Sequence, residues 1–385
     1  MTSLKNKALL AAAVLVLSAC QVTQVQPTRQ PTQPAQQAAT LPPPHPAGAQ
    51  LAPTVEEQPG VVPTFPPSAA PATATPAAEQ PKIGAKNAAA LKQVGQVSFD
   101  NPARLVWSPD GSILSVISND KMVRLDSKTL ENKGSVVFKS PIVLLDFSAD
   151  GRTMASTSDQ ATVELRDVTT GQTLSSLKPT APFSSLAFSP DGKSMALTSV
   201  DEIAATLWNV DSGKQTGTLN GFQTAAPVYD VSFTPDGKSM VWHARALVQI
   251  MDIASQKLGP AFEHEDFVQA FAVSADGKLL ATSAGGTLDG NFIPLVFLWD
   301  SASGKNLAKL KTPENVTALK FAPDGHLLAG GAGNQVMIWD ADSQQQSAVL
   351  PGHTDRISAV AFSPDGKFLA TAAADNTVRL WQVKP

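Results

Sequence analysis

Four side chains near the C-terminus form a candidate site, and three of them are of types that nucleophilic catalysis uses. His353 and Asp375 could act as a base and its orienting carboxylate, Thr371 carries a hydroxyl group, and Trp381 follows shortly after. A base of this kind must lie within hydrogen-bonding distance of the hydroxyl group that it deprotonates. The same side chains could instead form a structural network, because buried polar groups must be paired and pairing makes them rigid. The choice between the two depends on the elements that carry them.

An Asp-Gly pair recurs along the chain and is a second candidate for chemistry. A calcium ion needs several oxygen ligands that converge on one point, and each pair supplies a single carboxylate. Glycine in such a pair supplies the positive φ that a tight turn requires. We therefore interpret the pairs as turns, and we predict neither a metal nor a cofactor. Seven of the pairs stand in the same sequence setting, and their glycines are Gly111, Gly151, Gly192, Gly237, Gly277, Gly325 and Gly366.

The segments around these pairs are similar to one another. In the last copy, residues 362–366 (Phe-Ser-Pro-Asp-Gly) lie between two runs of alternating apolar residues, which predicts two strands joined by a tight turn. A third strand is expected at residues 377–381. The copies recur about every 40–45 residues, and four short strands per copy are typical of a propeller blade. The sequence therefore predicts an all-β fold, a single seven-bladed β-propeller with four-stranded antiparallel blades.

Short motifs between the turns indicate a family. The chain contains the pairs Gly352-His353, Trp299-Asp300 and Trp339-Asp340 at matching places in the copies. These motifs resemble those of WD repeats, and the chain from about residue 90 to its end resembles a seven-bladed WD-repeat propeller. The copies also depart from the pattern, which leaves the function open. The histidine position is filled only by His353 and His264, and the tryptophan position holds Asp126, Arg166 and Met251 in the first, second and fourth copies.

The resemblance implies a structural role for the four residues near the C-terminus. In WD repeats such a histidine, hydroxyl group, turn aspartate and tryptophan form a hydrogen-bonded network that braces one blade. His353, Thr371, Asp375 and Trp381 are therefore expected to stabilise the last blade, and we predict no catalytic residues and no enzymatic activity. A partial version of the network in the fifth copy would consist of His264 and Trp299.

The last copy is one strand short, because the chain ends directly after its third strand. Residues 91–97 alternate weakly and stand where the other copies have their outermost strand. We predict that this N-terminal strand pairs into the last blade and closes the ring, which removes the exposed strand edges. The predicted propeller domain spans residues 90–385.

The first twenty residues have the pattern of an export signal. Lys5 and Lys7 precede a short apolar run, and residues 17–20 read Leu-Ser-Ala-Cys. The apolar run is shorter than the roughly 20 residues that span a bilayer. The last four residues resemble a bacterial lipobox, which implies a lipoprotein signal peptide at residues 1–19, cleavage before Cys20 and its acylation with chains such as palmitate. An ordinary signal peptide with an incidental cysteine is the alternative, and Gln21 implies sorting to the outer membrane in a Gram-negative cell.

Residues 20–89 have a different composition from the repeats. They consist mainly of proline, glutamine, alanine and threonine, with almost no aromatic residues. Such a segment buries too little apolar surface to offset its chain entropy, so we predict a disordered linker. Its expected role is a stalk that lifts the propeller off the membrane. A proline-rich ligand for a groove-binding partner is the alternative.

Two insertions distinguish this chain from a regular array. Residues 285–294 lengthen the fifth copy, and residues 221–227 lengthen the connection to the fourth. In WD repeats both loop types open onto the face most used for partners, and binding residues concentrate on loops that a rigid scaffold holds. Tolerated variation in loop length is the alternative. The candidate partner contacts are Phe222, Tyr229, Arg245, Phe267 and Phe292.

The composition narrows the function. The net charge is −4 and the isoelectric point is about 5.7, which argues against binding nucleic acid through bulk charge. A single cysteine rules out an intramolecular disulfide. We therefore predict a monomeric, lipid-anchored, non-catalytic scaffold of the bacterial cell envelope that binds a protein or peptide. The alternatives are an enzyme or small-ligand binder acting at the mouth of the central channel, and a structural spacer without a specific partner.

Overall fold

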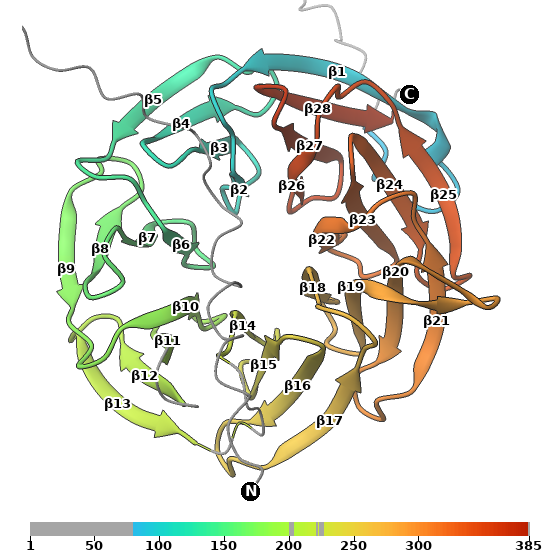
Figure 1. The fold of residues 1–385 in the computed structure, drawn as a ribbon. Coiled ribbons are helices and arrows are strands. Elements are labelled where there is room, and N and C mark those ends of the chain that lie inside the picture. The colour runs from blue at the N-terminus through green and yellow to red at the C-terminus, as the bar shows by residue number, and fades with distance from the viewer. Residues whose placement is uncertain (1–79, 200–203, 221, 223–226, 384–385) are drawn as a thin grey trace, which may run out of the picture. The chain divides into compact units, whose positions relative to one another are not determined.

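The computed structural model describes residues 80–199, 204–220, 222 and 227–383. In this part of the chain, strands β1 to β28 form seven four-stranded sheets, and one short 3-10 helix, η1 (Ala88–Ala90), precedes β1. The sheets stand around a central axis as the blades of a propeller (Figure 1). The prediction of an all-β, seven-bladed propeller is confirmed. Cys20, the signal peptide and most of the predicted linker lie outside the described residues.

Each of the first six blades consists of four strands that follow one another in the chain, with the innermost strand first. Blade one contains β2 (Arg104–Trp107), β3 (Ile113–Ile117), β4 (Lys121–Asp126) and β5 (Asn132–Val137). Blade two contains β6 (Leu144–Phe147), β7 (Thr153–Thr157), β8 (Val163–Asp167) and β9 (Thr173–Leu177). Blade three contains β10 (Phe183–Phe188), β11 (Ser194–Ser199), β12 (Ala205–Asn209) and β13 (Lys214–Leu219). Blade four contains β14 (Asp230–Phe233), β15 (Ser239–Ala244), β16 (Leu247–Asp252) and β17 (Leu258–Glu263). Blade five contains β18 (Ala270–Val273), β19 (Leu279–Leu288), β20 (Asn291–Asp300) and β21 (Asn306–Lys311). Blade six contains β22 (Val316–Phe321), β23 (Leu327–Ala332), β24 (Gln335–Asp340) and β25 (Gln345–Leu350). Blade seven contains β26 (Ile357–Phe362), β27 (Phe368–Ala373), β28 (Thr377–Val383) and, from the other end of the chain, β1 (Leu91–Ser98).

The Asp-Gly pairs form the turns between the first two strands of the blades. In blade seven, the hydroxyl group of Ser363 donates to a carboxylate oxygen of Asp365 (2.6 Å), which also accepts from the N–H of Lys367 (3.0 Å). Gly366 has a φ of 70°, a conformation that costs glycine little. Each such carboxylate therefore serves its own turn.

The closing strand β1 completes blade seven. It pairs with β28 in antiparallel register, from Leu91 opposite Val383 to Ser98 opposite Thr377. This pairing confirms the prediction that an N-terminal strand supplies the missing fourth strand of the last copy.

The packed part of the chain begins before the closing strand. Ile83 and Ala88 are 2% and 0% exposed and belong to the core between blades six and seven. The N–H of Ile83 donates to the carbonyl oxygen of Gly366 (2.8 Å). The propeller therefore extends to about residue 83, beyond the boundary at residue 90 that the sequence predicted. Ile83 is the only large apolar residue between residues 80 and 90, and this segment shows none of the alternation that marks a strand.

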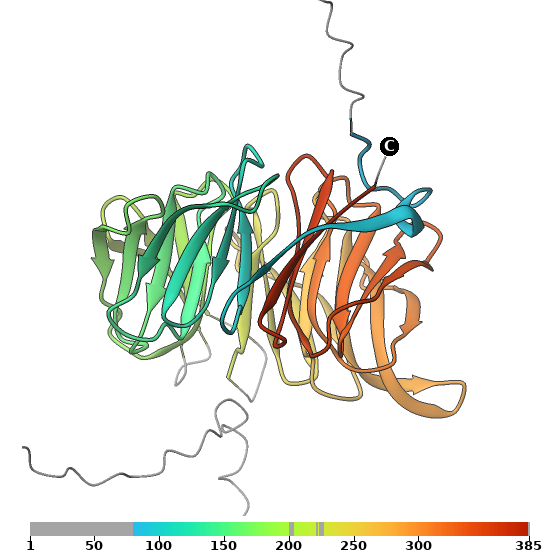
Figure 2. The ribbon, with the colours of Figure 1, turned by 90° about the horizontal axis from the view of Figure 1, so that it is seen from above.

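The two faces of the ring carry different connections, because antiparallel strands reverse direction at every turn. One face carries the seven Asp-Gly turns between the first two strands of the blades, and also residues 80–90, of which the Ile83 N–H donates to the carbonyl oxygen of Gly366. The opposite face carries connections such as residues 245–246, 264–269 and 289–290, and we name it the loop face. Figure 2 shows residues 80–90 (blue) and the C-terminal end on one side of the ring, and the long β19–β20 hairpin projecting on the other.

Candidate functional site

The structure brings the four C-terminal residues together in one hydrogen-bonded chain within blade seven. The indole N–H of Trp381 donates to the hydroxyl oxygen of Thr371 (2.9 Å), which lies 2.8 Å from Nε2 of His353. Nδ1 of His353 lies 2.9 Å from a carboxylate oxygen of Asp375. Thr371 and Trp381 lie on β27 and β28, and the other two lie in connections on the loop face. A neutral His353 with its proton on Nδ1 satisfies all of these bonds.

Burial determines what this network can do. Desolvation lowers the pKa of His353 and outweighs the opposite effect of Asp375. Burial also acts to raise the pKa of Asp375, but hydrogen bonds from Thr377, from the N–H of Thr354 and from His353 outweigh it and lower that pKa to about 2. Thr371 is 0% exposed, so a substrate has no access to its hydroxyl group. The arrangement ties the strands of blade seven together and offers no accessible nucleophile.

A similar network lies in blade five. Nε2 of His264 is 2.7 Å from the hydroxyl oxygen of Thr282, to which the indole N–H of Trp299 donates (2.8 Å). The sequence prediction lacks Thr282, although it follows its hairpin glycine at the same distance as Thr371. Nδ1 of His264 is buried and has no hydrogen-bond partner in the described part of the chain, and burial lowers the pKa of His264 to about 4. This version therefore lacks the carboxylate.

Phe222 does not lie on the surface. It is 4% exposed and meets Trp242 in an edge-to-face contact, with ring centroids 5.0 Å apart. Both belong to the core between blades three and four. The prediction of Phe222 as a partner contact is therefore wrong. An apolar side chain in an insertion can anchor the loop to the core as readily as it can contact a partner.

The other four candidates are exposed on the loop face of blades four and five. Tyr229, Phe267 and Phe292 are 44%, 48% and 59% exposed, and Arg245 is exposed as well. Backbone hydrogen bonds hold their segments: the N–H of Tyr229 donates to β15 (2.9 Å), and the N–H that follows Phe267 donates to the carbonyl of Arg245 (2.9 Å). We name these four residues the aromatic patch.

The aromatic patch rests on a packed layer. The ring of Tyr229 lies 6.0 Å from that of His243, which meets the ring of Phe271 edge to face at 5.7 Å. The ring of Phe292 lies directly against the backbone of Gly285, where an added Cβ atom would come within 2.7 Å of it. The long hairpin therefore needs glycine at this position to hold Phe292 against β19.

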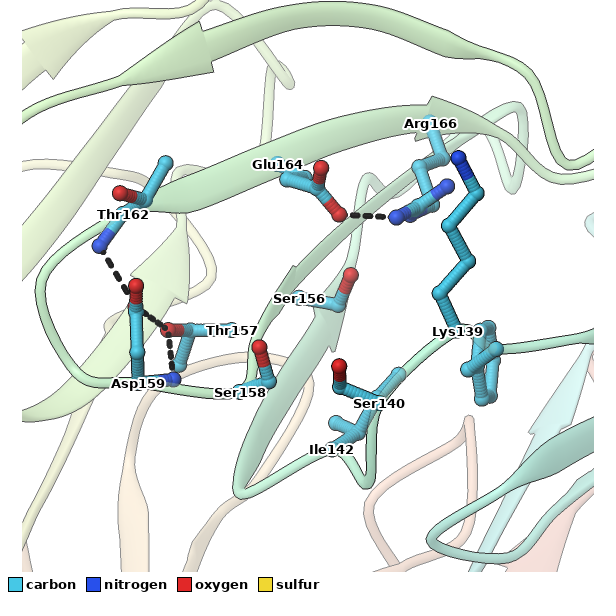
Figure 3. A pocket seen from close by; sticks show the side chains of 11 residues that line it. Lys139, Ser140, Ile142, Ser156, Thr157, Ser158, Asp159, Thr162, Glu164 and Arg166 are labelled. Atoms are coloured by element: carbon cyan, nitrogen blue, oxygen red, sulfur yellow. Dashed lines mark hydrogen bonds and ion pairs between the residues drawn. The ribbon is translucent and has the colours of Figure 1, made fainter.

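A pocket that the sequence analysis did not predict lies in blade two (Figure 3). It has a volume of about 300 Å³ and lies between the loop after β5 and the β7–β8 hairpin. A sequence signal for it exists, because Arg166 stands at the tryptophan position of this copy and no indole fills the space. The lining is mostly polar and includes Lys139, Ser140, Ser156, Ser158, Asp159, Thr162, Glu164 and Arg166.

The described part of the chain covers residues 80–199, 204–220, 222 and 227–383. Within these ranges no group of three or more His, Cys, Asp or Glu side chains is placed to hold a metal ion. In the same ranges no helix has the length and apolar character needed to cross a bilayer. The predicted export signal falls outside them.

Comparison with protein families identifies the repeat. The model for the WD domain, G-beta repeat, matches residues 304–340 and 344–382. Each match covers the outermost strand of one blade and the first three strands of the next, β21–β24 and β25–β28. The chain therefore carries WD40 repeats in a seven-bladed propeller. Sequence repeat and blade are offset by one strand, as the closing strand requires.

Curated proteins share part of this similarity. The chain is 34% identical over 126 residues to "B-type cell cycle switch protein ccs52B" of Medicago truncatula and 38% identical over 126 residues to "Pre-mRNA-processing factor 19 homolog 2" of Arabidopsis thaliana. It is 29% identical over 144 residues to "Small ribosomal subunit protein RACK1y" of Oryza sativa subsp. japonica. These segments cover 32%, 32% and 35% of this chain but only 25%, 22% and 41% of the three relatives. The similarity is thus confined to less than half of each protein.

Proposed function

We propose that this protein is a non-catalytic scaffold that binds a protein or peptide through the aromatic patch. The observation that carries the proposal is that three large rings and Arg245 are all exposed on the loop face of blades four and five. Aromatic and arginine side chains are enriched where proteins meet, and exposed apolar surface is otherwise unfavourable. The matched WD40 repeats support a binding role, because propellers of this kind commonly bind proteins.

The patch offers a surface that is largely formed before a partner arrives. The segments of Tyr229 and Phe267 are tied to neighbouring residues by backbone hydrogen bonds, and the ring of Phe222 packs against Trp242 in the core. A partner that meets an ordered surface loses less free energy to the ordering of loops. The name of one relative, a small ribosomal subunit protein, places that relative in a larger assembly, which accords with a scaffold role.

In this proposal the protein is attached to the bacterial cell envelope by a lipid on Cys20, at the outer membrane in a Gram-negative cell. The Leu-Ser-Ala-Cys motif after a basic and apolar start supports the attachment, and the proline-rich composition of the linker supports a stalk. Residues 80–90 join the propeller on the face opposite the aromatic patch. A tether that arrives there would leave the loop face open to a partner.

The substitution Cys20→Ala is expected to release the protein from membranes or to leave its signal peptide uncleaved. The thiol would be the acyl acceptor, and each methylene buried in the membrane contributes about 0.8 kcal/mol to binding. Membrane fractionation and the intact mass of the purified protein measure both effects. Gln24→Ala, outside the motif, is the control. A Cys20→Ala protein with unchanged fractionation and mass would rule out lipid attachment at this residue.

Removing the three rings of the aromatic patch is expected to abolish partner capture and to leave folding intact. A ring at the centre of an interface contributes about 2 kcal/mol or more, so each loss weakens binding at least about thirtyfold. The variant carries Tyr229→Ser, Phe267→Ser and Phe292→Ser. A photo-crosslinking residue at position 245, in intact envelopes, reports the partner.

The matched control is Leu174→Ser, because Leu174 is 61% exposed on β9 of another blade. It is expected to keep the crosslink at full yield. Equal yields of the same crosslinked partner from the parent and from the triple variant would contradict the proposal.

A further inference from the structure

The pocket in blade two occupies the place that the hydrogen-bonded network has in blade seven. Ser156 and Arg166 stand at the positions of Thr371 and Trp381, counted from the hairpin glycine and in strand register. In blade seven an indole fills this space. In blade two the guanidinium group pairs with Glu164 (Figure 3), and a space of about 300 Å³ remains. The pocket is therefore a blade-specific departure from the repeat.

We propose that this pocket binds a small carboxylate that also carries hydroxyl groups, such as a sugar acid. The site lies on blade two, whereas the aromatic patch lies on blades four and five, so the two are separate. The proposal adds a small-molecule ligand to the partner binding described above and does not depend on it.

Hydroxyl groups line the middle of the pocket. Figure 3 shows the oxygens of Ser140, Ser156 and Ser158 pointing into the same space, and Thr162 lies at its far end. None of the four hydroxyl groups has a hydrogen bond to another residue of the described chain. A hydroxyl group both donates and accepts, so a row of them suits the hydroxyl groups of a polyol. Ser156 is only 3% exposed and lines the pocket, so its hydroxyl group is open to a ligand that binds there.

Two positively charged side chains lie at one end of the blade-two pocket. Lys139 and Arg166 are the two cationic side chains that line the pocket, and Figure 3 draws both at the same end of it. Arg166 is held in place by Glu164 and by the carbonyl oxygen of Gly171, to which Nη1 donates (3.3 Å). Lys139 has no ion pair or hydrogen bond within the described residues and is exposed. One positive charge at this end is therefore uncompensated, and a carboxylate is the ligand group that would pair with it.

Asp159 places a negative charge at the other end of the pocket. Its Oδ1 accepts hydrogen bonds from the N–H groups of Ala161 and Thr162, both at 2.9 Å. These two bonds lower the pKa of Asp159, so the carboxylate is ionised at neutral pH. Its Oδ2 accepts no hydrogen bond from the described residues and can accept one from a ligand hydroxyl group. A second carboxylate would be repelled here, so the pocket favours a monocarboxylate.

The test titrates D-glucuronate into the full-length chain, purified in detergent, by isothermal titration calorimetry. We expect saturable binding at one site. D-glucose lacks the carboxylate and hexanoate lacks the hydroxyl groups, so each is expected to bind at least about tenfold more weakly. Lys139→Gln is expected to weaken glucuronate binding at least about tenfold and to leave glucose binding unchanged.

Two variants make the test specific. Lys128→Gln also removes one positive charge, but from the β4–β5 turn, on the face of the ring opposite the pocket. This variant is expected to bind glucuronate like the parent. Arg166→Trp places an indole in the pocket and is expected to abolish binding, with Arg166→Gln as a smaller change if the tryptophan variant does not fold. No binding of glucuronate by the parent at millimolar concentration would overturn the proposal. So would glucose binding as tight as that of glucuronate, or full affinity in Lys139→Gln.

Discussion

Deleting residues 80–98 is expected to abolish the cooperative unfolding transition of the propeller, whereas deleting residues 40–58 should leave it in place. The first deletion removes the closing strand β1 together with the buried Ile83 and Ala88. Blade seven then keeps three strands, and β28 loses its pairing with β1 along residues 377–383. The ring is left with an unpaired strand edge and with apolar side chains exposed to water, and both are unfavourable.

Differential scanning calorimetry of the two deletion proteins measures this difference. The deletions are equal in length, and the second falls in the proline-rich segment outside the described residues. Leu91→Asp is a milder variant, because Leu91 is 5% exposed and an unpaired charge there is costly. It is expected to lower the melting temperature without abolishing the transition. If the protein without residues 80–98 melts like the parent, the ring does not depend on β1.

Trp381→Ala is expected to lower the free energy of unfolding by about 3–5 kcal/mol, the usual cost of removing a large buried aromatic side chain. The indole is 3% exposed in the core between blades six and seven. Its N–H is also the donor that Thr371 accepts from. The substitution therefore creates a cavity and breaks a buried hydrogen-bonded network. Chemical denaturation monitored by circular dichroism measures the change.

Two further variants separate volume from hydrogen bonding. Trp381→Phe keeps much of the ring and removes the N–H, so we expect a smaller loss of about 1–3 kcal/mol. Phe292→Ala changes an exposed ring and is expected to stay within about 0.5 kcal/mol of the parent. A Trp381→Ala protein that keeps its stability but loses partner capture would contradict the structural role of the network and place blade seven in the binding site.

The architecture could be predicted because the signals for it are local. A turn such as that at Gly366 needs a glycine and a neighbouring aspartate whichever blade carries it, so the turns recur with the period of one blade. Register within a hairpin follows from the turn. The closing strand could be predicted by counting, since the last copy is one strand short. The two networks could be predicted in part, because His353 and His264 stand at a fixed distance before their turns.

The remaining features depend on contacts between distant segments. Ile83 and Phe222 are isolated large apolar residues in their segments, and only the contacts of Ile83 with blades six and seven and of Phe222 with Trp242 decide that they are buried. For the blade-two pocket, Arg166 marks the missing indole in the sequence. Whether neighbouring side chains collapse into the space that a lost indole leaves varies from site to site, and one chain position does not determine it.

The pairing of β1 with β28 also limits when the ring can close during folding. The ring joins residues 91–98 to residues 377–383, and contacts across so long a loop form late, because its closure entropy must be overcome first. The pairing of β1 with β28 cannot form until β28, the last strand, has been synthesised. An export signal in residues 1–19 would be synthesised hundreds of residues before β28, so export that begins during synthesis would act on a chain whose ring cannot yet have closed.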